Sequence, residues 1–304
     1  MAFQRIAIIG LGLLGGSIGL AIKAYLPDAT TTGYDADPAT RARAAERGLV
    51  QSICGSAASA VADAELVILC VPVGAMAAAA AELAGALPAG ALISDVGSSK
   101  QSVAKALAEA LPGHAIIPAH PVAGTERSGP DAGFASLFQQ RWCIITPPAD
   151  ADAGHLASLC QFWEALGARV EVMEAAHHDM VLAVTSHLPH LIAYTIVGTA
   201  SDLEGVTESE VIKYSAGGFR DFTRIAASDP TMWRDVFLSN KDAVLDMLQR
   251  FTEDLTALQR AIRVGDGDQL FEHFARTRAI RRSIIAEGQD DARPDFGRSD
   301  HGQD

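Results

Sequence analysis

The chain has 304 residues, enough for two domains of ordinary size. Hydrophobic residues make up 49% of it and aromatic residues only 6%, which favours helix-rich packing over a sandwich of aromatic-bearing strands. The net charge of −13 argues against a protein that binds nucleic acid or an anionic membrane surface. Four widely spaced cysteines with no C-x-x-C pair predict buried, reduced thiols in a cytoplasmic protein.

The first half alternates short apolar strands with helical stretches, which predicts a doubly wound, Rossmann-like α/β sheet. The expected strands are 5–10, 30–35, 65–72, 91–97, 115–121, 142–147 and 168–174. The expected helices are 14–26, one opened by Pro38, an alanine-rich stretch to about residue 87, 101–111 and 152–166. The glycine-rich run 6–22 falls short of the ~20 residues that a membrane span needs, so it is assigned to the first strand and helix.

The second half is predicted to be all helical, because no strand pattern follows residue 175. The expected helices are 175–200, 207–217, 230–262 and 266–287. The polar segment 287–304 has no apolar period and predicts a disordered tail. We therefore expect domains at 1–174 and 175–286, followed by the tail at 287–304.

A glycine motif follows the first strand. Gly10, Gly12 and Gly15 form G-x-G-x-x-G between a strand and a helix, which is typical of a dinucleotide site. The first glycine would make the tight turn, the second admits a pyrophosphate and the third lets helix and strand pack closely. Leu13 and Leu14 open the helix, whose free N–H groups would face the phosphates.

Asp35 ends the second strand, 20 residues beyond the motif. Its carboxylate would accept both ribose hydroxyls and repel a 2′-phosphate, so the pattern predicts NAD, although Arg41 and Arg43 leave NADP open. Val71 and Pro72, where strand 65–72 ends, are further expected cofactor contacts at the same edge.

Polar side chains also follow the next strands. Asp95, Ser98 and Lys100 come at the carboxyl end of strand 91–97 and predict a wall of the site, while Ser99 is expected to cap the following helix. His120 comes at the end of strand 115–121, before a glycine-containing loop. An imidazole there suits a general base that removes a hydroxyl proton as hydride leaves carbon.

The helical half carries a second polar group. His187 and His190 lie three residues apart, on one helix face, with Pro189 between them, and Asp179 is expected to orient His187. This H-x-x-H pair could hold zinc, but no third ligand is evident, so we expect no metal. Alternatively, His187 and His190 are histidines that pack in the hydrophobic core.

Three charged residues follow the glycine pair 217–218. Arg220, Asp221 and Arg224 are candidates for the substrate site, because an arginine fork suits a carboxylate held through two oxygens. A surface ion pair between Arg220 and Asp221 is the competing interpretation.

Five segments in order, GLGLLGGS, DVGSSK, HPVAGTERSG, HLPH and GGFRDFTRIA, resemble the prephenate/arogenate dehydrogenase family of tyrosine biosynthesis over residues 5 to 285. The resemblance implies a Rossmann domain, a helical domain through which two subunits form a homodimer, and oxidative decarboxylation of prephenate or arogenate by NAD(P). It also implies that His120 is the catalytic histidine, that Ser98 orients it or the substrate hydroxyl, and that Arg224 binds a substrate carboxylate.

The same resemblance gives weaker roles to other residues. Glu126 looks like a gating or side-chain-contacting acid, and His190 and Asp179 like supporting residues of the site. Arg220 and Asp221 are expected to reach the partner's site. The competing interpretations are another Rossmann-plus-helical dehydrogenase acting on a small hydroxy acid, and a non-catalytic NAD-binding protein.

Overall fold

A computed structural model describes residues 3–125, 127–202 and 217–286. The expected helix at 207–217, the candidate Glu126 and the tail at 287–304 therefore fall wholly or almost wholly outside the described residues. The chain divides into two compact units, residues 1–247 and 248–304, each of which is described by itself.

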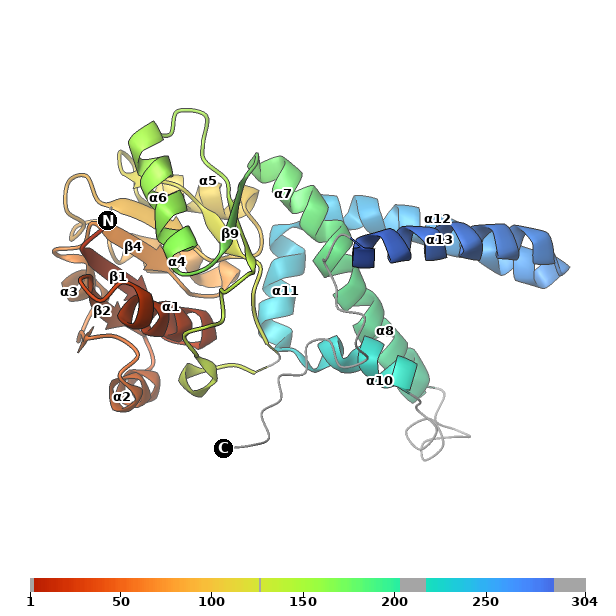
Figure 1. The fold of residues 1–304 in the computed structure, drawn as a ribbon, viewed down its shortest axis with the longest axis horizontal. Helices are drawn as coiled ribbons and strands as arrows, with labels where there is room; N and C mark the ends of the chain where they lie inside the picture. Colours follow the sequence, from red (N-terminus) through yellow and green to blue (C-terminus); the bar gives the residue numbers. More distant parts are fainter. Residues whose placement is uncertain (1–2, 126, 203–216, 287–304) are drawn as a thin grey trace. The chain divides into compact units, whose positions relative to one another are not determined.

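A six-stranded parallel sheet forms the base of the first unit, with strand order β3-β2-β1-β4-β5-β6 (Figure 1). Its strands are β1 (Arg5–Ile9), β2 (Thr30–Tyr34), β3 (Ser52–Ile53), β4 (Leu66–Leu69), β5 (Leu92–Asp95) and β6 (Ala115–Ile116). The connecting helices are α1 (Leu13–Tyr25), α2 (Pro38–Arg47), α3 (Ala57–Val61), α4 (Met76–Ala81) and α5 (Gln101–Ala110), with the 3₁₀ turn η1 (Val73–Ala75). This order reverses next to β1, where ligands bind in open parallel sheets.

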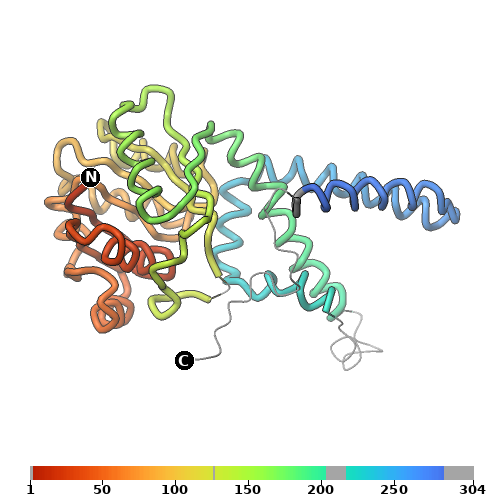
Figure 2. Tube along the Cα trace, in the orientation of Figure 1, coloured from red at the N-terminus to blue at the C-terminus, as the bar shows by residue number. Residues whose placement is uncertain are grey.

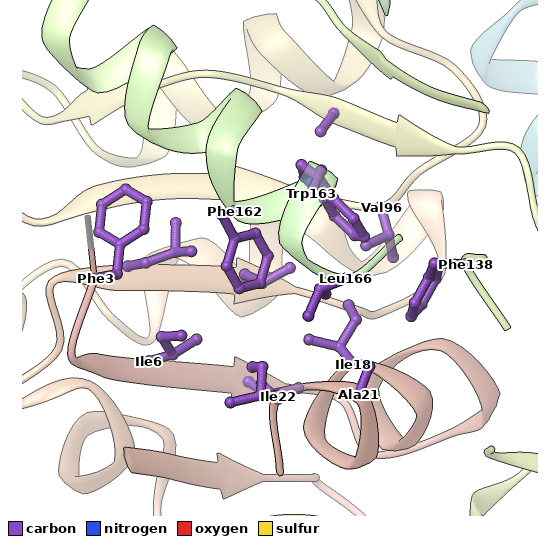
Figure 3. Close-up of a cluster of buried hydrophobic side chains, with 14 of the residues drawn as sticks. Phe3, Ile6, Ile18, Ala21, Ile22, Val96, Phe138, Phe162, Trp163 and Leu166 are labelled. Atoms are coloured by element: carbon purple, nitrogen blue, oxygen red, sulfur yellow. The ribbon is translucent and has the colours of Figure 1, made fainter. Parts of the chain in front are cut away.

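The central strands β1, β4 and β5 are buried on both faces, as a parallel sheet with helices on each side requires. Ile6 and Ile8 of β1 join a core cluster with Ile18 of α1, whereas Ala7 and Ile9 join a second cluster on the other face. Figure 3 shows the first cluster, in which the aromatic rings of Phe138, Phe162 and Trp163 also pack.

The expectation of one strand at 115–121 is wrong, because the chain changes sheets within it. Ile117 still donates a backbone hydrogen bond to Ile93 of the first sheet, but Pro118 has no N–H to continue that ladder. A second, three-stranded sheet follows, of β7 (Ala119–Pro121), β8 (Trp142–Ile145) and β9 (Arg169–Val172). The strands expected at 142–147 and 168–174 belong to this sheet, with η2 (Pro130–Ala132) and α6 (Ala153–Ala165) between its strands.

Helices follow from residue 175. They are α7 (Ala175–Leu182), a π-helical turn (Ala183–His187), α8 (Leu188–Asp202), α10 (Gly217–Thr223), the 3₁₀ turn η4 (Arg224–Ala227), α11 (Pro230–Ser239), α12 (Lys241–Val264) and α13 (Gly267–Ala286). The single helix expected at 230–262 is interrupted at Asn240, and the helix expected to reach residue 87 ends at Ala81. The short β3 and α3 were not predicted.

The trace in Figure 2 shows that α7 and α8 form one continuous rod through the π turn. By length and composition, Ala175–Asp202 is the one described stretch that could cross a membrane. It nevertheless buries His178, Asp179 and His187, which hydrogen-bond to other parts of the first unit. Buried polar side chains therefore hold this helix in the first unit, while apolar side chains such as Met180 and Val184 are exposed. In the second unit, α12 from Leu248 onward and α13 form a helical hairpin.

We predict that Gly15→Ala destabilises the first unit, whereas Gly12→Ala leaves its stability nearly unchanged. A Cβ on Gly15 would lie 1.9 Å from the carbonyl oxygen of Gly10, but a Cβ on Gly12 meets nothing within 4 Å. Thermal melts of the two variants and the parent measure the difference, which should be several degrees for Gly15→Ala. Equal melting temperatures would contradict the close packing of α1 on β1.

Candidate active site

The carboxyl ends of β1, β2 and β4 build a cradle at the start of α1. Gly10 has φ +97°, and a Cβ there would lie 2.5 Å from the carbonyl oxygen of Cys70, so only glycine fits this turn. Gly12 precedes α1 with open space above it and no side-chain cap on the helix. Free N–H groups, a helix dipole and an approachable backbone suit the phosphates of a dinucleotide. Val71 packs beside Gly10, which brings the end of β4 to the same cradle.

Asp35 lies at the end of β2 beside the glycine turn. Its Oδ2 accepts a hydrogen bond from the backbone N–H of Leu11 at 2.8 Å, and its Oδ1 accepts one from that of Asp37 at 3.0 Å. Each carboxylate oxygen has a further lone pair for a ribose hydroxyl. The carboxylate therefore also holds the glycine turn in place.

The two arginines that left NADP open already have partners. Arg41 donates from Nη1 to the carbonyl oxygens of Asp35 and Ala36, and Arg43 pairs with Glu46 and Asp131 at 2.8 and 2.7 Å. Both guanidinium groups are thus held by oxygen atoms of this chain. This arrangement favours NAD.

A buried ion pair lies at the carboxyl end of β5. The Nζ of Lys100 lies 2.5 Å from Oδ2 of Asp95, and both side chains are fully buried. The pair also holds Ala119 of β7, because Lys100 donates to its carbonyl oxygen at 2.7 Å and Asp95 accepts from its N–H at 3.2 Å. Burial raises the pKa of Asp95 and lowers the pKa of Lys100, while their mutual attraction opposes both shifts.

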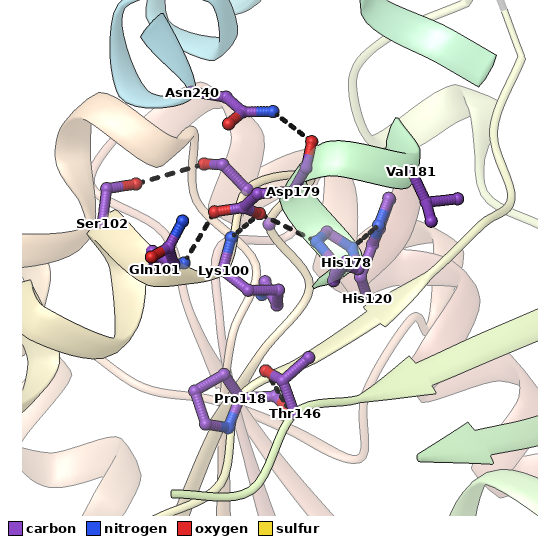
Figure 4. Close-up of polar contacts among 12 residues, drawn as sticks. Lys100, Gln101, Ser102, Pro118, His120, Thr146, His178, Asp179, Val181 and Asn240 are labelled. Carbon is purple, nitrogen blue, oxygen red and sulfur yellow. Dashed lines mark hydrogen bonds and ion pairs between the residues drawn. The ribbon is translucent and has the colours of Figure 1, made fainter. Parts of the chain in front are cut away.

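His120 follows Ala119 within β7, the short strand that forms the end of the expected strand 115–121. Its side chain is only 8% exposed, and its Nδ1 lies 2.8 Å from Nε2 of His178. Nδ1 of His178 lies in turn 2.8 Å from Oδ1 of Asp179 (Figure 4). The structure therefore contains a chain of three side chains that ends at a carboxylate.

This environment keeps His120 uncharged. Burial lowers the pKa of His120 well below its usual value, and the nearby His178 and Lys100 lower it further. Burial also lowers the pKa of His178, against the raising effect of Asp179. A neutral imidazole at neutral pH has a lone pair ready to accept a proton.

Asp179 itself corrects two expectations. Its Oδ1 and Oδ2 accept from the backbone N–H groups of Lys100 and Gln101 at 2.7 and 2.9 Å, so Asp179 caps α5 from another helix. Ser99, the expected cap, bonds instead to the hydroxyl of Ser239 at 2.8 Å. The carboxylate orients His178 and not His187, because it faces the start of α5.

His187 is held by a different residue. The side-chain amide of Asn240 lies 3.1 Å from its Nδ1 and also donates to the backbone oxygen of Asp179 at 2.8 Å. Nε2 of His187 is buried and makes no hydrogen bond within the described part of the chain. Burial lowers the pKa of His187 to about 4. An interaction with the backbone of Ser98 opposes this lowering of the His187 pKa.

His190 lies one turn further along α8. Its ring stacks on Trp233 of α11 at 3.6 Å, and its Nδ1 bonds to the backbone oxygen of Ser186 at 2.8 Å, beside the π turn and Pro189. Burial lowers the pKa of His190, and the charge of Arg224 adds to that effect. Within the described residues, no group of three or more histidine, cysteine, aspartate or glutamate side chains could hold a metal ion.

The remaining predicted site residues lie on nearby elements. Arg224 is exposed at the start of η4, and Arg220 and Asp221 are exposed on α10. Ser98 is half-buried in the turn between β5 and α5, and Pro72 is exposed in the turn after β4. Ser98 thus lies two residues before Lys100 in the same turn, and the turn η4, which carries Arg224, contacts α8, which carries His190, while Glu126 lies outside the described residues.

Sequence reasoning missed three functional candidates: His178, Trp233 and Asn240. His178 precedes Asp179 directly, so an adjacent histidine and aspartate at the start of a helix was the available signal. Trp233 and Asn240 gave no signal of their own, because their partners lie about 40 to 60 residues away in the chain.

Two family models match this chain. The model described as the nucleotide-binding domain of prephenate dehydrogenase matches residues 18–172, and the one described as its dimerisation domain matches residues 174–276. The chain belongs to the prephenate dehydrogenase family. A cyclohexadienyl dehydrogenase of Zymomonas mobilis is 48% identical over 93% of this chain and 96% of its own length, and a prephenate dehydrogenase of Bacillus subtilis is 34% identical over 92% and 76%.

A solved structure of the family is also similar. Prephenate dehydrogenase from A. aeolicus, in complex with hydroxyphenyl propionate and NAD+, superposes with a TM-score of 0.85 at 32% identity, covering 92% of this chain and 98% of that one. Arogenate dehydrogenase of Synechocystis shares the fold, with a TM-score of 0.77 at 24% identity. The family expected from the sequence motifs is thereby confirmed, as is its fold.

We predict that Lys100→Met destabilises the protein by roughly 3–5 kcal/mol, because it leaves the Asp95 carboxylate buried without its counter-charge. The double variant Asp95→Asn/Lys100→Met should recover part of that loss, since no charge then remains buried. Urea unfolding of the parent and of both variants measures the free energies. A double variant no more stable than Lys100→Met would argue against an ion pair between charged partners.

Proposed function

We propose that this protein oxidises and decarboxylates a cyclohexadienyl substrate, prephenate or its amino counterpart arogenate, with NAD as the hydride acceptor. One observation carries the proposal: a buried, neutral His120 follows Ala119 of β7, whose N–H donates to Asp95 at the carboxyl end of β5, the strand next to β4 of the dinucleotide cradle. Membership of the prephenate dehydrogenase family supports the substrate class.

The chemistry needs a base and anchors for two carboxylates. When bound, the nicotinamide accepts the hydride from C4 of the ring. His120 takes the proton of the C4 hydroxyl, which leaves a carbonyl para to a carboxylate. Carbon dioxide then leaves and the ring becomes aromatic, a step that the substrate itself drives.

In this proposal, other residues bind the substrate or position the reacting groups. Arg224 holds a substrate carboxylate, Ser98 orients the substrate hydroxyl or His120, and His190 on Trp233 forms an adjacent wall. Glu126 gates the substrate, and Arg220 and Asp221 extend to the partner's site. Asp179 supports the site from behind instead of touching the substrate, because it is buried against α5.

Cofactor binding is assigned to residues 1–174 and substrate binding to 175–286. Gly10, Gly12, Leu13, Leu14 and Gly15 would hold the pyrophosphate. Asp35 would bind the ribose of NAD, and Val71 and Pro72 would line the same cradle. The arginines that could neutralise a 2′-phosphate are already paired, which supports NAD over NADP.

The protein is proposed to act as a cytoplasmic homodimer through its helical part. All four cysteines are free thiols, which fits a reducing compartment. Exposed apolar side chains recur on the helices, among them Val184, Ile196, Leu245, Phe271 and Phe274. Such surfaces mark protein interfaces, and the match to a dimerisation domain supports one between two copies.

The direct test follows NADH absorbance after purified protein and NAD are mixed with prephenate, with arogenate, or with a 3-hydroxy acid as the matched negative. We expect NADH and carbon dioxide in equal amounts from prephenate or arogenate and none from the hydroxy acid. Turnover of the hydroxy acid alone would favour the alternative, a dehydrogenase of small hydroxy acids.

We predict that His120→Asn lowers kcat by about 10²–10⁴ without weakening NAD binding, because only proton removal is lost. In the parent, kcat/KM should fall on the acid side only well below pH 6.5. The sign follows from the lowered pKa of His120: its neutral, basic form persists until the pH drops through that value. The variant should lack this acidic limb, and activity within threefold of the parent would exclude His120 as the base.

We predict that Arg224→Ala raises KM for the substrate by about 10–150-fold, the loss of one charge-assisted hydrogen bond to a carboxylate worth ~1.5–3 kcal/mol. KM for NAD should stay constant, and Arg224→Lys should recover little because an ammonium cannot grip two oxygens in one plane. Steady-state kinetics with each ligand varied separately measures both constants. An effect on KM for NAD alone would place Arg224 at the cofactor.

We predict that Phe271→Asp weakens the dimer, since it puts a charge on a side chain that is 73% exposed in the single chain. Glu272→Gln, the exposed neighbour, is the control and should leave the dimer intact. Sedimentation velocity at several concentrations measures the association. A parent protein that sediments as a monomer at micromolar concentration would contradict the proposed assembly.

A further inference from the structure

We propose that His178 and Asp179 are positioning residues that fix the tautomer of His120, with the proton on Nδ1, so that Nε2 is the atom that takes the substrate proton. The inference rests on the function proposed above, in which His120 is the base. It concerns two side chains behind the catalytic ring, neither of which needs to touch the substrate.

The assignment starts at Asp179. Burial alone would raise the pKa of this carboxyl, but hydrogen bonds from His178, Gln101 and Lys100 outweigh burial and lower it. An ionised carboxylate only accepts hydrogen bonds, so Nδ1 of His178, 2.8 Å from Oδ1, must carry a proton and donate it. The two backbone N–H groups at the start of α5 hold the carboxylate in this orientation.

The proton positions then follow along the chain. Because burial lowers its pKa, His178 is neutral, and a neutral imidazole with a proton on Nδ1 has a lone pair on Nε2. That lone pair faces Nδ1 of His120 at 2.8 Å, so Nδ1 of His120 is the donor. The remaining lone pair of His120 is on Nε2, on the opposite side of the ring from His178.

The arrangement also suits the charge that forms during the reaction. When Nε2 of His120 takes the hydroxyl proton, the ring becomes a cation that donates through Nδ1 to His178. The Asp179 carboxylate then lies next in line and offsets the positive charge, as the aspartate does in a Ser-His-Asp triad. The Lys100–Asp95 pair holds the adjacent Ala119 on both its N–H and its carbonyl, which keeps the His120 backbone in register.

Nitrogen NMR of the full-length protein labelled with ¹⁵N-histidine reads the tautomer directly. Comparison with the spectrum of His120→Asn identifies the His120 signals. At pH 7 we expect a protonated Nδ1 and an unprotonated Nε2 for His120. A proton on Nε2 in the parent would overturn the proposal, and so would an unchanged tautomer in His178→Leu.

Kinetics of matched variants separates positioning from bulk structure. His178→Gln offers a side-chain oxygen that can accept from Nδ1 of His120, so its kcat should stay within about tenfold of the parent. His178→Leu offers none, and its kcat should fall by about 10²–10⁴ with both KM values nearly unchanged. His177→Asn alters the exposed neighbour and should behave like the parent. Equal kcat losses in the Gln and Leu variants would contradict the inference.

A second variant covers the case in which His178→Leu does not fold. Asp179→Asn keeps the size of the side chain but adds amide donors, which should remove the preference of His120 for one tautomer in the same spectrum. An unchanged preference would overturn the proposal. If the parent turns over neither prephenate nor arogenate, the proposed function fails while the NMR result stands by itself. If His120→Asn is inactive but the His178 variants match the parent, only the positioning role fails.

Discussion

The Asp179 carboxylate accepts three hydrogen bonds: two from the backbone at the start of α5 and one from His178 (Figure 4). Its own backbone oxygen accepts a fourth, from Asn240, which also holds His187. These contacts join the α/β part of the first unit to the helices that follow residue 175. Asp179 thus contacts His178 behind His120, the start of α5 after Lys100 and, through Asn240, the residue that holds His187.

The proposed base, His120, is buried and uncharged. His120 is buried on β7 against His178, so burial and the positive charge of Lys100 both oppose its protonation. The net charge of −13 would repel a dianionic substrate at long range, and in the proposed function Arg224 would provide the local attraction instead. The proposed base and the proposed carboxylate anchor thus lie on different elements, His120 on the strand β7 and Arg224 at the start of a short 3₁₀ turn.

Short sequence patterns predicted the parts of the structure that depend on residues close together in the chain. The glycine spacing and Asp35 predicted the cofactor cradle, and the strand–helix alternation predicted most of the parallel sheet. The change of sheet at Pro118 was missed because an apolar run looks the same whether it continues one sheet or joins another. Asp179 was linked to the wrong histidine, because helical spacing says nothing about a partner on α5, 78 residues earlier in the chain.

The central claim is that Nε2 of His120 takes the proton of the substrate hydroxyl while Nδ1 stays bonded to His178. A crystal structure of the protein with NAD and a para-hydroxyphenyl product analogue tests it most directly. We expect the phenolic oxygen within hydrogen-bonding distance of Nε2, the analogue's carboxylate on Arg224, and an intact contact between His120 and His178. A phenolic oxygen bound elsewhere, with Nε2 of His120 facing protein, would contradict it.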